Sequence, residues 1–190
     1  MTFEDFKIKD SVLVVFTGEG KGKTSAAIGL LCRALGNRWK VAFIQYIKDW
    51  GVSEHVFLRD IQPLYKDQLY FVKSGKGFVD APQDLSPKQI TFKQHRQLAQ
   101  KAYQESLVCV SNGKYNLVIC DEINNAVHQK LITIKQLEKL ITSRSAQTSL
   151  CLTGRDFPKS LINHADIITD MHKLKHHFDQ KFLANKGIDY

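Results

Sequence analysis

The sequence lacks the features that mark secreted and membrane proteins. No apolar run approaches the roughly 20 residues that cross a bilayer, and residues 1–6 are unlike a signal peptide. The cysteines form no C-x-x-C pair and lie far apart, at Cys32, Cys109, Cys120 and Cys151. We therefore expect reduced, buried thiols rather than disulfides or a zinc site. These absences favour a cytoplasmic protein that does not contact a membrane.

Strong signals for nucleic-acid binding are also absent, although the net charge is +8 with histidines neutral. Lysine and arginine are scattered along the chain, without a basic tail or a module of alternating basic and aromatic residues. Neutralising nucleic-acid phosphates would be one use for this charge. A pocket for a small anionic ligand, together with solvated surface, is the favoured interpretation. We expect no nucleic-acid partner.

Strand and helix patterns alternate along the chain after an N-terminal arm at residues 1–11. The 190 residues are 43% hydrophobic and 24% charged, which is ordinary for a globular domain. Apolar runs typical of buried strands occur at residues 12–16, 41–46, 69–72, 117–120, 149–153 and 167–168. No repeat or linker interrupts them. Residues 12–190 are therefore predicted to form one α/β domain of the P-loop NTPase type, with a mostly parallel sheet of about six strands and helices on both faces.

Several helix boundaries carry their own signals. Gly36 and the asparagine after it should end the first helix. Ser86, with proline next and Gln89 three residues later, predicts the start of a helix that runs to about residue 112. Thr133 and Gln136 form a second capping box.

One stretch indicates chemistry directly. Residues 17–24 read T-G-E-G-K-G-K-T, with a buried-strand pattern before them and a helical pattern after them. Glycines let backbone N–H groups curl around an anion, and the helix N-terminus adds its positive dipole end. Lys23 would supply charge to phosphate oxygens, and the Thr24 hydroxyl would be a Mg²⁺ ligand.

An ordinary glycine turn is the alternative, but the G-K-T ending between a strand and a helix favours a phosphate-binding loop. The usual pattern opens with glycine, where this chain has Thr17. The sequence thus predicts binding of a nucleoside triphosphate. The expected binding residues of the loop are Gly18, Gly20, Lys21, Gly22, Lys23, Thr24 and Ser25.

Three other predicted strand ends carry polar side chains, and parallel strands gather their ends at one edge of a sheet. Gln45 and Lys48 follow the second strand and are expected to bind the nucleotide. Arg155 follows the fifth strand, where a bidentate fork could reach phosphate, although a surface arginine is the plainer alternative. Asp121 and Glu122 end the fourth strand and could hold a phosphate-bound Mg²⁺ (or Mn²⁺), or could instead cap a helix. The expected metal ligands are Thr24, Asp121 and Glu122.

The phosphate loop, with threonine at its first position, resembles that of the P-loop type ATP:corrinoid adenosyltransferases, in which threonine also fills that place. The resemblance continues in collinear order through Q-Y-I-K at residues 45–48, D-E at 121–122, L-T-G-R at 152–155 and G-I-D-Y at 187–190. It covers residues 12–190. The closing G-I-D-Y together with T-G-R is more diagnostic than the loop alone.

The resemblance implies that ATP and a reduced corrinoid are the substrates. Cobalt(I) would attack the 5′-carbon of ATP and expel inorganic triphosphate, with ATP reversed in the loop relative to other P-loop proteins. Lys23 and Arg155 would stabilise charge on the triphosphate. A homodimer and an electron-donating reductase are implied as well. Two other functions stay open: another P-loop enzyme (a nucleotide kinase or an ATPase), and a non-catalytic ATP-responsive binding protein.

One position departs from the family pattern. The family shows G-F-x-W after the third strand, whereas residues 77–80 read G-F-V-D. The resemblance implies a catalytic role for Phe78, whose ring would pack under the corrin and keep a lower ligand off cobalt. Asp80 replaces the tryptophan, and this replacement is the single feature that favours a non-catalytic protein.

Overall fold

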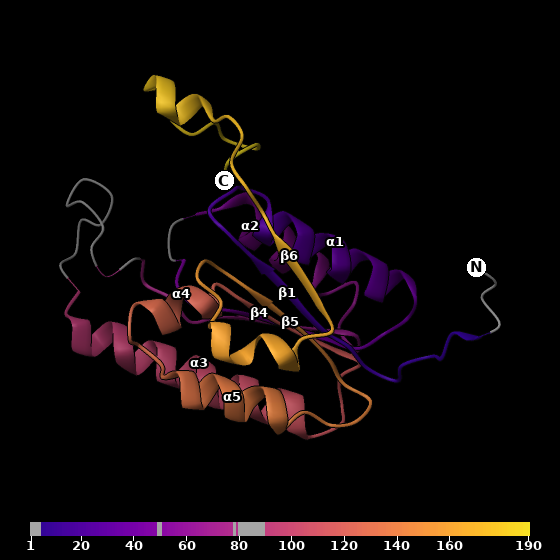
Figure 1. Cartoon of the computed structure of the whole chain (residues 1–190). Helices are drawn as coiled ribbons and strands as arrows, with labels where there is room; N and C mark the ends of the chain where they lie inside the picture. Colours follow the sequence, from indigo (N-terminus) through magenta and orange to yellow (C-terminus); the bar gives the residue numbers. More distant parts are fainter. Residues whose placement is uncertain (1–4, 49–50, 78, 80–89) are drawn as a thin grey trace.

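A computed structural model describes residues 5–48, 51–77, 79 and 90–190. Its centre is a six-stranded sheet with strand order β3-β2-β4-β5-β1-β6, and every pair of neighbouring strands is parallel (Figure 1). The strands are β1 (Leu13–Thr17), β2 (Val41–Gln45), β3 (Leu69–Lys73), β4 (Leu117–Asp121), β5 (Ser149–Thr153) and β6 (Ile167–Asp170). The predicted α/β class with a parallel sheet of about six strands is confirmed.

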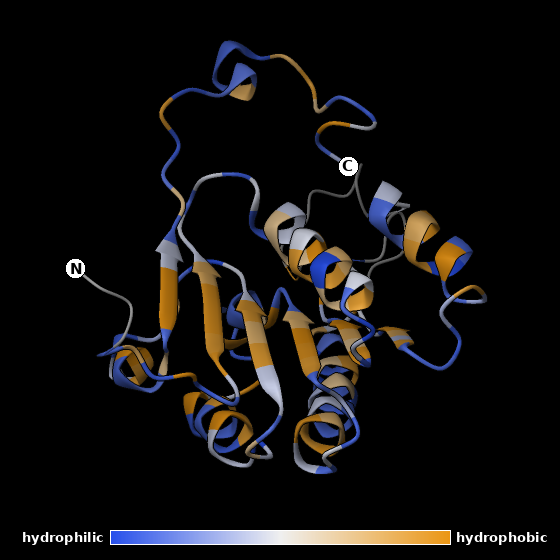
Figure 2. Ribbon diagram, turned by 90° about the vertical axis from the view of Figure 1, so that its right-hand side faces the viewer, coloured by the Kyte–Doolittle hydropathy of each residue, from blue (hydrophilic) through white to orange (hydrophobic). Residues whose placement is uncertain are grey.

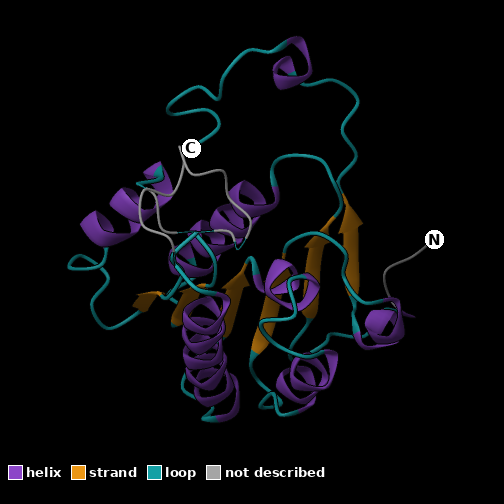
Figure 3. Ribbon diagram, turned by 90° about the vertical axis from the view of Figure 1, so that its left-hand side faces the viewer, coloured by secondary structure: helices purple, strands orange, loops and turns teal. Residues whose placement is uncertain are grey.

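Helices cover both faces of the sheet, as Figure 3 shows. They are α1 (Lys23–Gly36), α2 (Ser53–Ile61), α3 (Phe92–Ser111), α4 (Ile123–His128) and α5 (Ile134–Thr142), with short 3₁₀ segments at Lys159–His164 and His177–Gln180. Two apolar clusters separate the layers. One joins α1 and α2 to the sheet, and the other joins α3, α4 and α5 to the opposite face.

Strand β2 shows how the sequence builds both clusters. Val41 and Phe43 pack in the cluster of α1 and α2, whereas Ala42 and Ile44 pack in the cluster of α3 to α5. Alternate side chains of a strand point to opposite faces, so a strand covered on both sides must be apolar throughout. The central strands are accordingly coloured as hydrophobic in Figure 2. Edge strand β6 is exposed along its length.

Most boundary predictions hold. Helix α1 ends at Gly36, and Thr133 forms a capping box with Gln136 at the start of α5. The predicted start of α3 is wrong: this helix begins at Phe92, after Thr91, whose side chain accepts from the Gln94 amide in a second capping box. Thr91 has an extended backbone, which separates α3 from the signal at residues 86–89. That signal lies outside the described residues.

The cysteine prediction holds in part. Cys109, Cys120 and Cys151 are buried free thiols, whereas Cys32 is free but exposed. It lies on the outer side of α1, between buried Leu31 and exposed Arg33. Amphipathic helices expose one side to solvent, so the apolar surroundings of Cys32 in sequence did not imply burial. In the parts of the chain that are described, no helix combines the length and apolarity that a bilayer crossing requires.

The chain beyond β6 leaves the sheet and arches back toward it, as Figures 1 and 2 show. Its last residues return to the carboxyl end of the sheet. There Lys21 forms an ion pair with Asp189, and the Ser53 hydroxyl donates a hydrogen bond to the Tyr190 carbonyl at 2.9 Å. The C-terminal segment therefore belongs to the same edge of the sheet as the phosphate loop.

Candidate functional site

A cleft of about 1310 Å³ opens at the carboxyl end of the sheet. The phosphate loop forms one wall, and residues 187–190 lie against the loop. Lys48 and Glu54 contribute from the side of β2 and α2. Glu122 and Arg155 contribute from the ends of β4 and β5. The sheet thus gathers at one place the strand ends that the sequence marked as polar.

The glycines of the loop are required by close packing. A Cβ atom at Gly18 or Gly20 would lie 2.5 or 2.6 Å from the Met171 carbonyl oxygen, which is too close for any side chain. The Gly20 amide donates to that oxygen at 2.6 Å. Gly22, with φ of 103°, occupies the left-handed region and precedes the first residue of α1. The loop is therefore held by the end of β6, and the Gly20 amide serves the fold.

Lys23 reaches back over the loop. Its ammonium donates to the carbonyl oxygens of Gly18 at 2.7 Å and Gly20 at 2.6 Å. Burial lowers the pKa of Lys23, while the negative charge of Glu122 acts in the opposite direction. Both partners are neutral carbonyls, so anionic phosphate oxygens would be stronger acceptors for the same ammonium.

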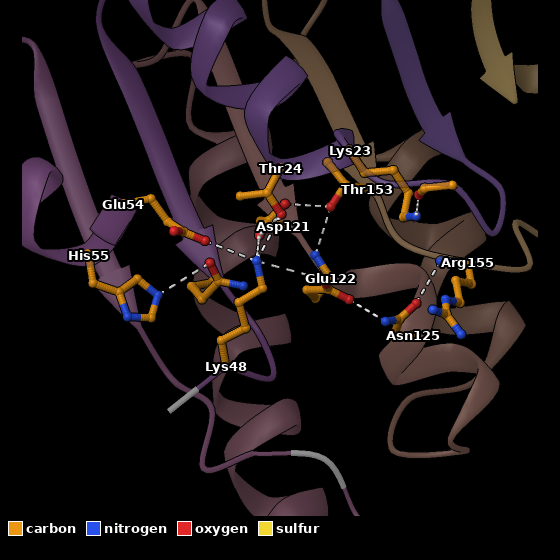
Figure 4. Close-up of polar contacts among 12 residues, drawn as sticks. Lys23, Thr24, Lys48, Glu54, His55, Asp121, Glu122, Asn125, Thr153 and Arg155 are labelled. Carbon is orange, nitrogen blue, oxygen red and sulfur yellow. Dashed lines mark hydrogen bonds and ion pairs between the residues drawn. The ribbon is translucent and has the colours of Figure 1, made fainter. Parts of the chain in front are cut away.

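Asp121 is the centre of a hydroxyl network that Figure 4 shows. Its side chain is fully buried, and each carboxylate oxygen accepts from a threonine. Thr24 of α1 donates at 3.1 Å, and Thr153 at the end of β5 donates at 2.5 Å. The Thr153 hydroxyl also accepts from the Glu122 amide at 2.9 Å. In the sequence Thr153 stands out only within the T-G-R motif of the family, and its contact with Asp121, 32 residues earlier, depends on the pairing of β4 with β5.

Lys48 lies among three carboxylates. Its ammonium is 3.0 Å from a Glu54 oxygen, 3.8 Å from Asp121 and 3.9 Å from Glu122, and it donates to the Thr24 hydroxyl at 2.9 Å. Burial lowers the pKa of Lys48, but the three negative charges outweigh that effect and raise it overall. Lys48 is therefore a charged ammonium within the predicted metal site.

Glu122 stands at the start of a helix, but its side chain makes no capping hydrogen bond there. It occupies the N-cap position of α4, with φ of 64°, yet its carboxylate lines the cleft and accepts from the Asn125 side chain. Burial and the neighbouring charge of Asp121 raise the pKa of Glu122 to about 7. The side-chain oxygen Oδ1 of Asn125 accepts from the Arg155 backbone amide at 2.6 Å, which fixes the backbone of Arg155 beside the cleft.

Two cations at the rim of the cleft, Arg155 and Lys21, form ion pairs that differ in their exposure. The Arg155 guanidinium lies 3.1 Å from Glu19, and both side chains are more than half exposed. Lys21 pairs with Asp189, which also accepts from the Asn185 amide and lies 3.3 Å from His177. An exposed pair such as Arg155–Glu19 contributes little free energy, so Arg155 could exchange Glu19 for an anionic ligand. The Asp189 side chain is only 4% exposed, so its pair with Lys21 is the more enclosed of the two.

The structure brings most of the predicted site residues to the cleft, and of the described ones Asp121, Gly18 and Gln45 do not line it. The predicted residues that line it are Gly20, Lys21, Gly22, Lys23, Thr24, Ser25, Lys48, Glu122 and Arg155. Asp121 lies directly beneath them, bonded to Thr24. Gly18, which belongs to the loop, packs against Met171. Gln45 is fully buried, with its side-chain oxygen 3.4 Å from the His55 ring. Phe78, like Asp80, lies outside the described residues.

The predicted magnesium ligands fit that ion. Thr24, Asp121 and Glu122 offer hydroxyl and carboxylate oxygens, which are hard donors. Within the described residues, no three His, Cys, Asp or Glu side chains are grouped so as to hold a metal by themselves. Mg²⁺ commonly takes one or two protein oxygens and completes its shell with water and substrate phosphates. The donor set is therefore suited to a metal that binds together with a nucleotide.

Comparison with known proteins gives one consistent result. The family model described as ATP:corrinoid adenosyltransferase BtuR/CobO/CobP matches residues 9–190. The corrinoid adenosyltransferase of Pseudomonas aeruginosa is 30% identical over 184 residues, which cover 94% of this chain and 83% of that protein. The corrinoid adenosyltransferases of Escherichia coli K12 and Salmonella typhimurium are 28% and 26% identical over 180 residues, covering 94% of this chain and 85% of each relative.

Proposed function

Since the chain belongs to the ATP:corrinoid adenosyltransferase family and is a transferase that moves the adenosyl group of ATP to a corrinoid, we propose how its cleft performs this transfer. Cobalt(I) of the corrinoid attacks the 5′-carbon of ATP with its electron pair. A cobalt–carbon bond forms while the bond from that carbon to the triphosphate oxygen breaks. Inorganic triphosphate leaves with the bonding electrons, and no proton has to move.

The tasks left to the protein are alignment and charge stabilisation. The observation that carries the proposal is the Lys23 ammonium, held by neutral loop carbonyls at the mouth of the cleft. In the proposed complex it turns to the triphosphate, and the α1 N-terminus at Thr24 and Ser25 adds its dipole. Arg155 leaves its exposed partner Glu19, and Lys21 leaves Asp189, to bind phosphate oxygens. Cobalt(I) is already a strong nucleophile, so a general base is not required.

Mg²⁺ or Mn²⁺ would be held by Thr24, Asp121 and Glu122 together with phosphate oxygens. Such an ion neutralises negative charge that grows on a leaving triphosphate. Each carboxylate oxygen of Asp121 accepts a hydrogen bond from a threonine hydroxyl, and this arrangement holds the carboxylate in one orientation toward α1. Thr153 acts here as a positioning residue for Asp121.

The family supports several further proposals that rest on likeness alone. Gln45 and Lys48 contribute to nucleotide binding, Lys48 from within the cleft and Gln45 from the buried layer behind it. Phe78 shields the lower face of cobalt. A reductase supplies cobalt(I), the protein is a homodimer, and it acts in the cytoplasm.

The decisive experiment supplies ATP, Mg²⁺ and chemically reduced cobalamin. We expect the spectrum of a light-sensitive cobalt–carbon product and one inorganic triphosphate for each product molecule. Lys23→Ala should lower turnover by about two orders of magnitude, since one charge-stabilising group is worth roughly 3 kcal/mol. Lys40→Ala is the matched control, because Lys40 is exposed and lies just before β2, at the opposite end of that strand from the cleft.

The other functions predict different products. A nucleotide kinase or an ATPase would release ADP or orthophosphate instead of triphosphate. A non-catalytic binding protein would retain ATP and form no cobalt–carbon bond. Normal turnover in Lys23→Ala would contradict the proposed role of the phosphate loop.

A further inference from the structure

The Lys48 ammonium occupies the position of a cation in the predicted metal site. It donates to the same Thr24 hydroxyl that would bind Mg²⁺, at 2.9 Å. It also lies within 4 Å of an oxygen of Asp121 and of Glu122, the two predicted carboxylate ligands. Figure 4 shows the end of this side chain pointing into the group formed by the three residues.

The environment of Lys48 holds the ammonium there. Its side chain is 14% exposed, and Glu54 of α2 binds it at 3.0 Å. Charges that are removed from water need close partners of opposite sign. Among the described residues, Glu54, Asp121 and Glu122 supply them. The other cations that face Glu122 are Lys23 and Arg155, and the contacts of these two are with loop carbonyls and with Glu19.

We propose that Lys48 is an internal cation that occupies the metal position in the nucleotide-free protein, so that the divalent ion binds only together with the nucleotide. The inference rests on the proposed metal site at Thr24, Asp121 and Glu122. A divalent ion entering alone would meet the positive charge of the ammonium and would have to compete with it for the Thr24 hydroxyl. A triphosphate brings enough negative charge to bind both cations, so its arrival removes this obstacle.

The test is a Mn²⁺ titration, with free Mn²⁺ measured by electron paramagnetic resonance. Without nucleotide, the wild-type protein should bind Mn²⁺ weakly, and Lys48→Met should bind it at least about tenfold more tightly, because a repelling charge is gone and three carboxylates are left. Lys48→Arg retains the charge and should stay weak. Lys40→Met, which removes an exposed lysine outside the cluster, should behave as wild type. Asp121→Asn added to Lys48→Met should abolish the gain.

Structural damage would lower metal affinity, so a gain cannot arise from it. Should Lys48→Met fail to fold alone, folding that Mn²⁺ restores would support the proposal, and folding that Mn²⁺ leaves unrestored would overturn it. Equal Mn²⁺ affinity of wild type and Lys48→Met without nucleotide would also overturn it.

A parallel titration with ATP, corrected for Mn²⁺ bound by ATP in solution, separates the two hypotheses. Mn²⁺ binding by the wild type only with ATP supports both of them. Absence of Mn²⁺ binding even with ATP refutes the metal site itself, whereas tight binding with and without ATP refutes only the role of Lys48.

Discussion

Thr153→Val tests whether the hydroxyl network around Asp121 positions the metal site. Valine has nearly the shape of threonine and lacks the hydroxyl. The substitution removes the 2.5 Å bond to Asp121 and the 2.9 Å bond from the Glu122 amide, in a place where Thr153 is fully buried. The Asp121 carboxylate and the Glu122 amide both remain but lose their partner, so the substitution should lower the free energy of unfolding by more than the value of a single hydrogen bond.

The structure allows an estimate of the magnitude. A hydrogen bond to a charged group contributes about 1.5–3 kcal/mol, and a buried amide left without a partner costs about 1–3 kcal/mol. Because the two effects share one hydroxyl and are not additive, we expect the free energy of unfolding to fall by about 3 kcal/mol. In a domain of this size that corresponds to a Tm lower by about 6–12 °C.

The function should respond separately from the stability. A positioning partner of a metal ligand typically changes metal affinity by about 10–100-fold. The Mg²⁺ concentration that gives half-maximal adenosyl transfer should therefore rise by about that factor in Thr153→Val, measured below its Tm. Thr153→Ser restores a hydroxyl and should recover most of this loss.

Thr148→Val is the matched control. Thr148 is also fully buried next to β5, but it donates one bond, at 2.8 Å, to the neutral Tyr115 carbonyl, away from the cleft. Its replacement should cost about 1 kcal/mol and leave the Mg²⁺ dependence unchanged. If Thr153→Val shows the Mg²⁺ dependence of Thr148→Val, Thr153 does not position Asp121.

Two further predictions concern Glu122 and Phe78. Burial beside Asp121 raises the pKa of Glu122 to about 7 from an ordinary value near 4.5. Between these pH values the folded state binds more protons than the unfolded state, so the stability that this group contributes is lost as the pH rises through 7. With chelator present, Glu122→Gln should therefore gain in Tm relative to wild type between pH 5 and pH 8, and a constant difference would contradict the shift. Phe78→Ala should slow the reaction far more when cobalt starts as cobalt(II) with a reductant than when cobalt(I) is supplied, and equal losses would refute the shielding role.

The sheet and the phosphate loop could be predicted because their signals are local. Each strand is an apolar run between turn residues, and the loop has its glycines between a strand and a helix. The start of α3 could not be predicted so well, because Ser86 and Thr91 both open a pattern with glutamine three residues later. The sequence alone does not rank two such signals, and α3 begins after the second of them, at Phe92.

Contacts between distant segments could not be read from the sequence. Lys21 meets Asp189 across most of the chain length, and Gly20 bonds to Met171 beyond the last strand. The motif at residues 187–190 was noticeable, yet nothing local indicated that it lies against the phosphate loop. The position of Lys48 is similar: its place after a strand indicated a binding role, while its contact with Thr24 depends on how α1 packs on the sheet.

Strand alternation explains which polar residues reach the metal site and what makes Glu122 unusual. Leu117, Ile119 and Asp121 are alternate residues of β4, so their side chains point to the same face of the sheet, toward α1. The Asp121 side chain therefore meets Thr24 of that helix. Gln45 points to the same face of β2 as Val41 and Phe43, and its side chain is buried next to His55 of α2.

Glu122 directly follows Asp121, and continued alternation would direct its side chain to the opposite face of the sheet. Its left-handed backbone, with φ of 64°, interrupts the alternation, so that the Glu122 carboxylate lines the cleft while both carboxylates lie within 4 Å of the Lys48 ammonium. Such a backbone costs a residue with a side chain about 1–2 kcal/mol. The Glu122 amide donates to the Thr153 hydroxyl and the carboxylate accepts from Asn125, and these two bonds offset that cost. Thr153 therefore stabilises the turn that makes a paired-carboxylate site possible, in addition to holding Asp121.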